Sequence, residues 1–241
     1  MKLPKVIPRL LQFFLLTALP FQAYAGLLLS KSIVTFDDPS MSRQDVTVIN
    51  DSDEQPLYVS VEPYEVVAPG SIEEQLVRTD ESENPGLLAT PAKLIVQPGS
   101  TSLVRLLILE ARGERERIYR VNFIPITKPP ELEADEEDES IAKFLQISVA
   151  YQALVIVPPL EAVAKPEFSR VGKKAVFSNS GNSNYLLSKG KQCNPANPSE
   201  CVDIPGKRIY PGNEWTTELP FDGPVSYSLR TLAGTKALVV P

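Results

Sequence analysis

The sequence has no histidine, only two cysteines and a single tryptophan among its 241 residues. The absence of histidine excludes serine–histidine–acid and cysteine–histidine triads, histidine-ligated zinc sites and histidine general bases. Most familiar hydrolase and metalloenzyme mechanisms are thereby removed. We expect a protein without enzymatic activity, without a metal and without a cofactor.

Positive charge is also scarce, because 24 Lys and Arg residues stand against 30 Asp and Glu residues, for a formal net charge of -6. A whole-molecule electrostatic footprint for nucleic acid or anionic lipid is therefore missing. We expect a protein partner and no nucleic acid.

A long apolar run occurs only near the start of the chain. Three basic residues precede the apolar stretch 10–21, which is followed by the Ala-Tyr-Ala tripeptide at 23–25. This order predicts a secretory signal peptide, residues 1–25, cleaved before Gly26. The alternative is a retained anchor, for which the apolar core is short. We expect an exported, soluble protein that is not inserted into the membrane after cleavage.

The two cysteines, Cys193 and Cys201, stand eight positions apart in a segment rich in Pro, Asn and Ser. In an oxidising compartment such a pair most simply forms a structural disulfide. A metal site or a redox pair is the alternative, but the spacing is not C-x-x-C and no third ligand is evident.

The 23 prolines leave little room for long helices and favour short strands separated by turns. Segments rich in β-branched and aromatic residues lie between them. These segments are 45–49, 57–61, 103–109, 119–124, 144–157, 175–178, 184–188, 225–229 and 236–240. Many short strands of this kind predict an all-β chain of β-sandwiches.

The chain is expected to divide at Pro158-Pro159, where the longest predicted strand meets residues that cannot continue a central ladder. We predict an N-terminal domain at 26–157, a linker at 158–166 and a C-terminal β-sandwich domain at 167–241. The acidic segment 131–139 indicates a solvated loop inside the first domain. A calcium site is the alternative there, but the glycine and the spacing of an EF-hand are missing.

The predicted strand 144–157 is the most informative segment. Side chains of one face alternate with those of the other, and one face is apolar throughout. Its members are Leu145, Ile147, Val149, Tyr151, Ala153, Val155 and Val157. At about 3.3 Å per residue the strand exceeds the usual length, so part of it should extend past its neighbours. The alternative is that both faces of this strand are buried in the protein's own core.

The order of several segments resembles the periplasmic pilus chaperones of the PapD-like family. Residues 87–105 are similar to that family's Pro, apolar strand, Pro-Gly turn and Val-Arg strand. Residues 116–125 resemble its next strand, and residues 145–158 resemble its donor strand and the lead into the second domain. Residues 178–182 occupy the place of an Asn-rich turn. The similarity runs in order over nearly all of the chain after residue 25.

The resemblance implies two immunoglobulin-like β-sandwich domains in a boomerang (L-shaped) arrangement. It also implies a periplasmic chaperone that lends an edge strand to a pilus or fimbrial subunit, a mode of strand addition, and delivers the subunit to an outer-membrane usher. Leu145, Ile147, Val149 and Tyr151 would fill the groove of the subunit. A free chaperone could cap its exposed strand by dimerising.

The sequence departs from the family where basic residues should hold the subunit's C-terminal carboxylate. The corresponding positions are Ile33 and either Ala153 or Leu154, and none is basic. Lys31, Arg105 and Arg120 are the candidate substitutes for that anchor. This departure resembles the alternative chaperone-usher and common-pilus chaperones. Glu116 matches a family glutamate that pairs between the domains, and the alternative is an exposed charge at a strand end.

Two other classes of function remain open. A pilus subunit or adhesin could use the same sandwich, although here the first domain keeps its own long last strand. A periplasmic enzyme with paired carboxylates, such as a glycosidase, is the second class. The acidic residues cluster in the predicted loop or scatter at turns, and only Trp215 is available to stack on a sugar.

Overall fold

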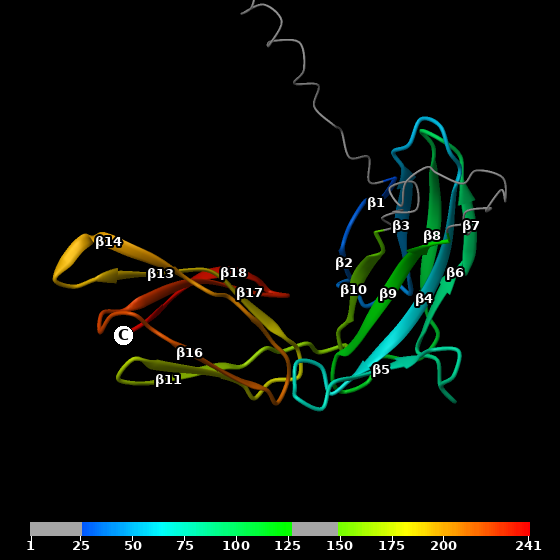
Figure 1. Cartoon of the computed structure of the whole chain (residues 1–241). Coiled ribbons are helices and arrows are strands. Elements are labelled where there is room, and N and C mark those ends of the chain that lie inside the picture. The colour runs from blue at the N-terminus through cyan, green and yellow to red at the C-terminus, as the bar shows by residue number, and fades with distance from the viewer. Residues whose placement is uncertain (1–25, 127–148) are drawn as a thin grey trace, which may run out of the picture.

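The computed structural model describes residues 26–126 and 149–241, and every regular element in these ranges is a β-strand. The strands build two β-sandwiches that meet at an elbow, so the molecule is L-shaped (Figure 1). The expected all-β fold of two immunoglobulin-like domains is confirmed. Within these described ranges no helix is long and apolar enough to cross a membrane.

Some expectations lie outside the described residues. These are the signal peptide at 1–25, the acidic segment 131–139, and Leu145 and Ile147 of the predicted donor strand. The domain limits at 157 and 167 stay a prediction.

The N-terminal sandwich consists of two sheets. One has the strand order β1-β3-β8-β6, and the other has the order β2-β10-β9-β4-β5 with β7 also paired to β4. Their bounds are β1 (Leu27–Leu29), β2 (Ile33–Thr35), β3 (Arg43–Asn50), β4 (Leu57–Val67), β5 (Gln75–Arg78), β6 (Leu87–Thr90), β7 (Lys93–Val96), β8 (Thr101–Ile108), β9 (Arg117–Pro125) and β10 (Tyr151–Val157).

Alternating apolar side chains place one face of each sheet in the core between them. Val46 and Val48 of β3 are buried, as are Val121 and Phe123 of β9 and Val155 of β10. A fully buried side chain of this size contributes about 1.5 to 3 kcal/mol. Because β10 supplies part of this core, the N-terminal sandwich is closed by a strand of its own.

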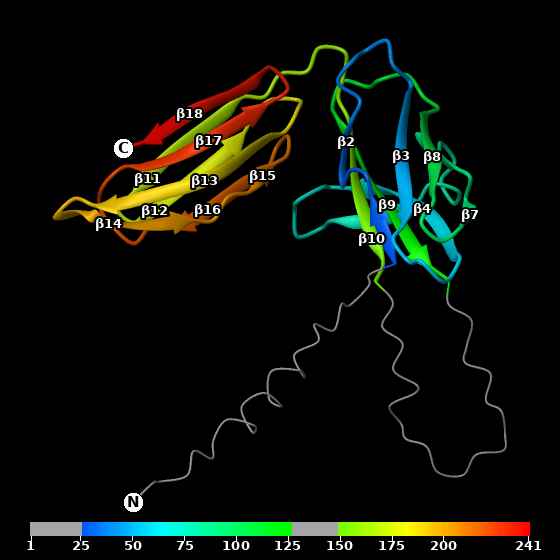
Figure 2. The ribbon, with the colours of Figure 1, turned by 90° about the horizontal axis from the view of Figure 1, so that it is seen from above.

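The C-terminal sandwich also has two sheets. Their orders are β11-β12-β16 and β14-β13-β17-β18, with β15 paired to β13 (Figure 2). The bounds are β11 (Pro166–Val171), β12 (Lys174–Asn179), β13 (Tyr185–Asn194), β14 (Asn197–Ile204), β15 (Arg208–Ile209), β16 (Glu214–Glu218), β17 (Val225–Thr231) and β18 (Gly234–Val240). Phe177, Tyr185 and Tyr227 lie in its core.

The expected disulfide is present, because Cys193 and Cys201 are bonded across the β13–β14 hairpin. The prediction that the strand at 184–188 ends there is wrong, since β13 continues to Asn194 and β14 follows at once. Pro198 is tolerated because β14 is an edge strand, where a missing ladder donor costs little.

The last strand of the N-terminal sandwich is shorter than predicted within the described residues. β10 begins at Tyr151, and Val149 and Ala150 belong to no strand. The pairing with β9 also ends at Tyr151, opposite Phe123, although β9 itself continues to Pro125. Pro125 has no N–H to donate to the next bond of this ladder. Alternation alone had predicted a strand because it does not reveal where pairing with a neighbouring strand stops.

The two sandwiches contact each other through a small apolar cluster at the elbow. Val66, Ile118 and Ile156 of the N-terminal sandwich are buried there against Tyr210 of the C-terminal sandwich. Leu154 packs at the edge of the same cluster. The second face of β10 therefore becomes apolar toward its end because it packs at the junction.

Candidate functional site

One edge of β10 is only partly covered. On one side β10 pairs with β9 along its whole length, whereas the parallel partner β2 reaches only Leu154 to Ile156. Figure 1 shows both strands on the side of the N-terminal sandwich that faces the C-terminal arm. Among the described residues no strand pairs with Tyr151–Ala153 on that side.

The direction of the backbone groups follows from the bonds that β2 does make. Leu154 N–H donates to the Ser32 carbonyl over 2.8 Å, and the Ile156 carbonyl accepts from Phe36 N–H over 3.0 Å. Because alternate residues of a strand direct their backbone groups to the same edge, the N–H and C=O of Gln152 point to that side too. The described residues provide them with no backbone partner there.

The apolar side chains of the predicted donor segment differ in their surroundings. Tyr151 is half-buried and packs against the core of the N-terminal sandwich, whereas Val149 is 47% exposed. Leu145 and Ile147 lie outside the described residues. Of the predicted donor side chains within them, Val149 is thus the one whose apolar surface is open to a partner.

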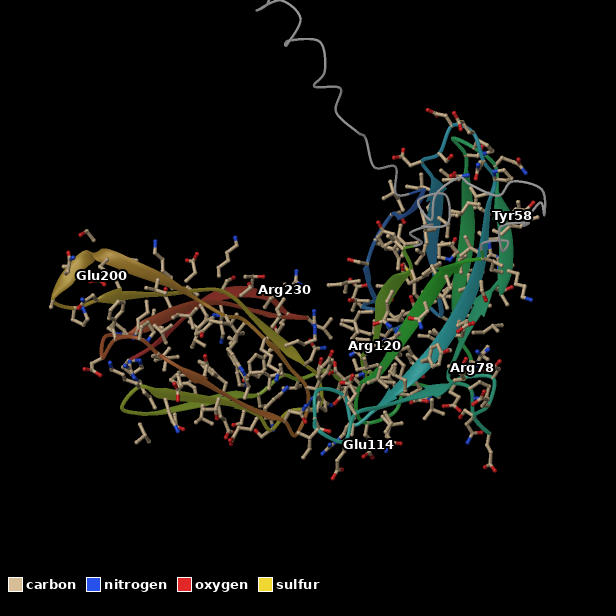
Figure 3. The ribbon with its side chains drawn as sticks, viewed as in Figure 1. Tyr58, Arg78, Glu114, Arg120, Glu200 and Arg230 are labelled. Atoms are coloured by element: carbon tan, nitrogen blue, oxygen red, sulfur yellow. A yellow bond between two sulfur atoms is a disulfide. The ribbon has the colours of Figure 1, made fainter. Side chains whose placement is uncertain are left out.

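A cleft of about 400 Å³ lies between the two arms, beside the covered part of this edge. Its charged residues are Arg208, Arg230 and Asp37, so the lining has one net positive charge. Its other lining residues are Ile33, Thr35, Ile156, Asn184, Thr231 and Leu232. Figure 3 shows Arg230 on the C-terminal arm and Arg120 on the N-terminal arm.

The two cleft arginines lie near enough to affect each other. Burial lowers the pKa of Arg208, and the charge of Arg230 lowers it further, while Tyr210 and Glu116 oppose the change. Arginine keeps its charge in proteins despite such shifts. An anion in the cleft would therefore relieve the repulsion between two guanidinium groups and accept hydrogen bonds from them.

The three predicted anchors are not part of the cleft lining. Lys31 Nζ donates to Gln44 Oε1 over 3.1 Å, and Arg105 lies 3.5 Å from Asp45. Arg120 donates to Glu74 Oε1 over 2.7 Å. Each of these cations already has a local polar partner.

Sequence reasoning missed Arg208 and Arg230 as candidates. They belong to β15 and β17, which are far from the donor segment in the chain. No motif marks them, and only the elbow between the arms brings them near Ile33. The one available signal was the absence of a basic residue at Ile33 and at both Ala153 and Leu154.

Glu116 lies between the two arms, where its resemblance to a family glutamate had placed it. Its Oε2 accepts hydrogen bonds from Asn184 Nδ2 over 2.6 Å and from Ser183 Oγ over 3.3 Å. Its backbone N–H donates to the Asn182 carbonyl over 3.0 Å. Asn182 Nδ2 in turn donates to the Glu114 carbonyl, so backbone and side chains both join the arms here.

A second polar contact braces the elbow from the loop between β4 and β5. Asn213 Nδ2 donates to the Pro69 carbonyl over 2.6 Å. Gly70 has φ +74°, and a Cβ there would lie 2.8 Å from the Tyr210 ring, so a glycine is required on both counts. The arms are therefore held by two sets of polar contacts in addition to the apolar cluster.

The comparison with protein families identifies the N-terminal part of the chain. Residues 31–158, more than half of the chain, match the family described as the CS5 fimbrial protein N-terminal domain. The chain belongs to this family. Its relatives include a CS1 fimbrial subunit of Escherichia coli, which is 30% identical over 164 residues. That match covers 66% of this chain and 68% of the relative.

Solved structures share the whole two-domain fold. The Class 5 fimbriae chaperone CfaA is 23% identical, with a TM-score of 0.59 over 89% of this chain and 99% of that one. The E. coli chaperone DraB is 21% identical, with a TM-score of 0.60 over 89% of this chain and 95% of that one. The resemblance to the pilus chaperones is confirmed, and this chain has their fold.

Proposed function

We propose that the protein is a periplasmic chaperone that binds fimbrial subunits by pairing the open edge of β10 with a subunit strand. It then delivers the subunit to an outer-membrane usher. The role involves no turnover of a substrate, so the protein is not an enzyme. The single observation that supports this most is the uncovered backbone edge at Gln152 beside the exposed side chain of Val149.

An uncovered edge next to apolar side chains is an aggregation hazard unless another strand pairs with it. A fimbrial subunit that lacks a strand has the complementary hazard, namely an apolar groove flanked by unpaired backbone groups. Strand addition covers both at once. It also allows a free chaperone to cap this edge by dimerising.

The energies agree with tight but exchangeable binding. The side chains of Leu145, Ile147 and Val149 contribute about 1.5 to 3 kcal/mol each when fully buried in a groove. Tyr151 adds less because it already packs against the core of the N-terminal sandwich. Ladder hydrogen bonds add about 1 kcal/mol apiece. The loss of translational freedom and the ordering of both partners offset a large part of this sum.

Arg208 and Arg230 are the residues that we propose as anchors for the C-terminal carboxylate of the subunit. They line the cleft that adjoins the β2–β10 pair, and a guanidinium can hold a carboxylate with two parallel hydrogen bonds. Lys31, Arg105 and Arg120 lie outside this lining, which makes them the second choice. An anchor at the cleft would fix the register in which the subunit strand pairs with β10.

A fimbrial subunit or adhesin is the second candidate function, because the curated relatives are named fimbrial subunits. The core of the N-terminal sandwich favours the chaperone. β10 fills the last position of the sandwich with the chain's own Ala153 and Val155, both fully buried. A subunit that receives a strand from elsewhere would lack this one.

The test is to co-express a fimbrial subunit with the Val149→Asp variant and to measure how much soluble subunit is recovered from the periplasm. A charge at this exposed position should weaken pairing with an apolar groove and leave folding intact. We expect recovery to fall several-fold. Val171→Asp is the matched control, because Val171 is 80% exposed on the C-terminal arm.

Equal recovery with Val149→Asp and with the wild type would contradict strand donation. Recovery of the protein itself inside assembled fimbriae would favour the subunit alternative. The thermal midpoint of each variant, measured alone, separates a binding defect from a folding defect.

A further inference from the structure

Asn184 links a carboxyl group at the elbow to a guanidinium group in the cleft. Its Nδ2 donates to Glu116 Oε2 over 2.6 Å, and its Oδ1 accepts a hydrogen bond from Arg208 Nη1. An ionised carboxylate only accepts and a guanidinium only donates. One orientation of the amide therefore satisfies both neighbours, and each neighbour stabilises the position of the other.

Glu116 is only 9% exposed, although its side chain carries an ionisable group. Oε2 accepts both of its side-chain hydrogen bonds, whereas Oε1 is buried and has no partner among the described residues. A buried oxygen without a partner is rare in folded proteins because its desolvation is not compensated. A proton on Oε1 therefore removes the negative charge whose burial is costly.

We propose that Glu116 is a positioning residue that holds Arg208 in the cleft through Asn184 and holds it less firmly when Glu116 is protonated. The inference rests on the proposed function, because it concerns the same cleft and its capacity for a carboxylate. It adds a regulatory step, in which the protonation state of Glu116 at the elbow sets the affinity of the cleft for the C-terminal carboxylate of a peptide chain.

Protonation weakens this link because it removes the negative charge of Glu116. With the proton on Oε1, which has no other partner among the described residues, Oε2 accepts from Asn184 Nδ2 as a neutral carbonyl oxygen, without charge assistance. The attraction between the charges of Glu116 and Arg208 is lost at the same time. Asn184 then holds Arg208 less firmly, and the orientation of Arg208 in the cleft is less restricted.

Burial raises the pKa of Glu116 above its ordinary value, and the hydrogen bonds from Asn184 and Ser183 oppose that change. Protonation therefore begins at a higher pH than for an exposed glutamate.

The other charged or titratable groups near Glu116 are few. Arg208 faces it from β15, and its charge lowers the pKa of Glu116. Tyr210 follows on the same segment, and its own pKa is raised by burial and by the charge of Glu116. Arg117, the next residue in the chain, is bound by Glu65 and Glu110. Arg208, Tyr210 and Arg117 are not expected to change charge in mildly acidic solution.

The experiment follows the side-chain Nε–Hε signal of Arg208 in the free, ¹⁵N-labelled protein from about pH 7.5 to about pH 5. N-acetyltyrosine serves as the carboxylate probe, and N-acetyltyrosine amide is its neutral control. We expect the Arg208 signal to move with pH. The dissociation constant of N-acetyltyrosine should rise about tenfold as the pH falls through the same range. This is the change expected when one charge-assisted hydrogen bond is lost.

Glu116→Gln is the decisive variant, because the glutamine side chain is neutral at every pH and does not titrate. Its Arg208 signal and its affinity for N-acetyltyrosine should both be independent of pH. Glu114→Gln, a change of an exposed neighbour, should behave like the wild type. Asn184→Ser provides a second test, because it removes the amide that joins Glu116 to Arg208 and leaves the Glu116 carboxyl group in place.

The proposal is overturned if Arg208 responds to pH equally in the wild type and in Glu116→Gln, or if N-acetyltyrosine and its amide bind alike. Both measurements use the free protein and leave β10 unchanged. Failure here is therefore distinguishable from failure of strand donation, which the Val149→Asp variant tests.

Discussion

Leu154 of β10 lies directly opposite Ile33 of β2 in the parallel pair that borders the cleft. The resemblance to pilus chaperones would place basic residues at Ile33 and at either Ala153 or Leu154, and all three are apolar here. Ile33 lines the cleft, and Leu154 packs at the elbow cluster. The positive charge of the cleft comes instead from the opposite arm, through Arg208 and Arg230.

Removal of one cleft charge should weaken subunit capture without unfolding the protein. Arg230 is exposed, so Arg230→Gln should change the free energy of unfolding by less than about 0.5 kcal/mol. The affinity for a subunit should fall about tenfold, the usual scale for a lost charged contact. Titration calorimetry with a purified fimbrial subunit peptide that ends in a free carboxylate measures this.

Arg105→Gln is the matched control for that prediction, because Arg105 is paired with Asp45 away from the cleft. If Arg105→Gln weakens binding as much as Arg230→Gln does, the anchor does not lie in the cleft.

The stability of the protein should depend on pH through Glu116. Its raised pKa means that the folded protein binds the proton more tightly than the unfolded chain does. The contribution of this group to the free energy of unfolding therefore falls as pH rises from the ordinary carboxyl pKa through the folded-state pKa. Glu116→Gln lacks this dependence, so it should gain stability relative to the wild type as pH rises.

Urea denaturation at several pH values measures that difference. A difference between Glu116→Gln and the wild type that stays constant between about pH 5 and about pH 7.5 would show that Glu116 does not titrate there.

The disulfide should stabilise the C-terminal arm without affecting the candidate site. For a closed loop of nine residues the loop-entropy model gives about 2.6 kcal/mol. The Cys193→Ala/Cys201→Ala double variant should lose stability of this order in urea denaturation. Figure 3 places Glu200, the neighbour of Cys201, at the far end of the C-terminal arm. Subunit recovery at low temperature should therefore be unchanged, and a specific loss of binding would contradict this separation.

The sequence predicted the strands that build the cores, because alternation of apolar and polar residues reports which side chains are buried. It predicted β3, β9 and β17 for this reason. The composition did not single out β11, which has no buried residue, or β15, which has only two residues. Within the described residues the sequence pattern also began β10 too early, at Val149 and Ala150, since alternation does not show where pairing with a neighbouring strand stops.

The candidate site was only partly predictable. Val149 and Tyr151 were chosen from their alternation, and Glu116 was chosen from its place in the resemblance. Arg208 and Arg230 were not foreseen, because their role depends on how the arms meet at the elbow. Asn184 was predicted only as the start of a strand, although its amide joins Glu116 to Arg208.

Hydrogen exchange at the backbone amide of Gln152 tests strand donation most directly. In the free protein this N–H points to the uncovered edge of β10, so it should exchange much faster than the N–H of Leu154, which donates to Ser32. Binding of a fimbrial subunit should protect Gln152 strongly and leave Leu154 little changed. An amide of Gln152 that exchanges equally fast in the free protein and in the complex would contradict the pairing of β10 with the subunit.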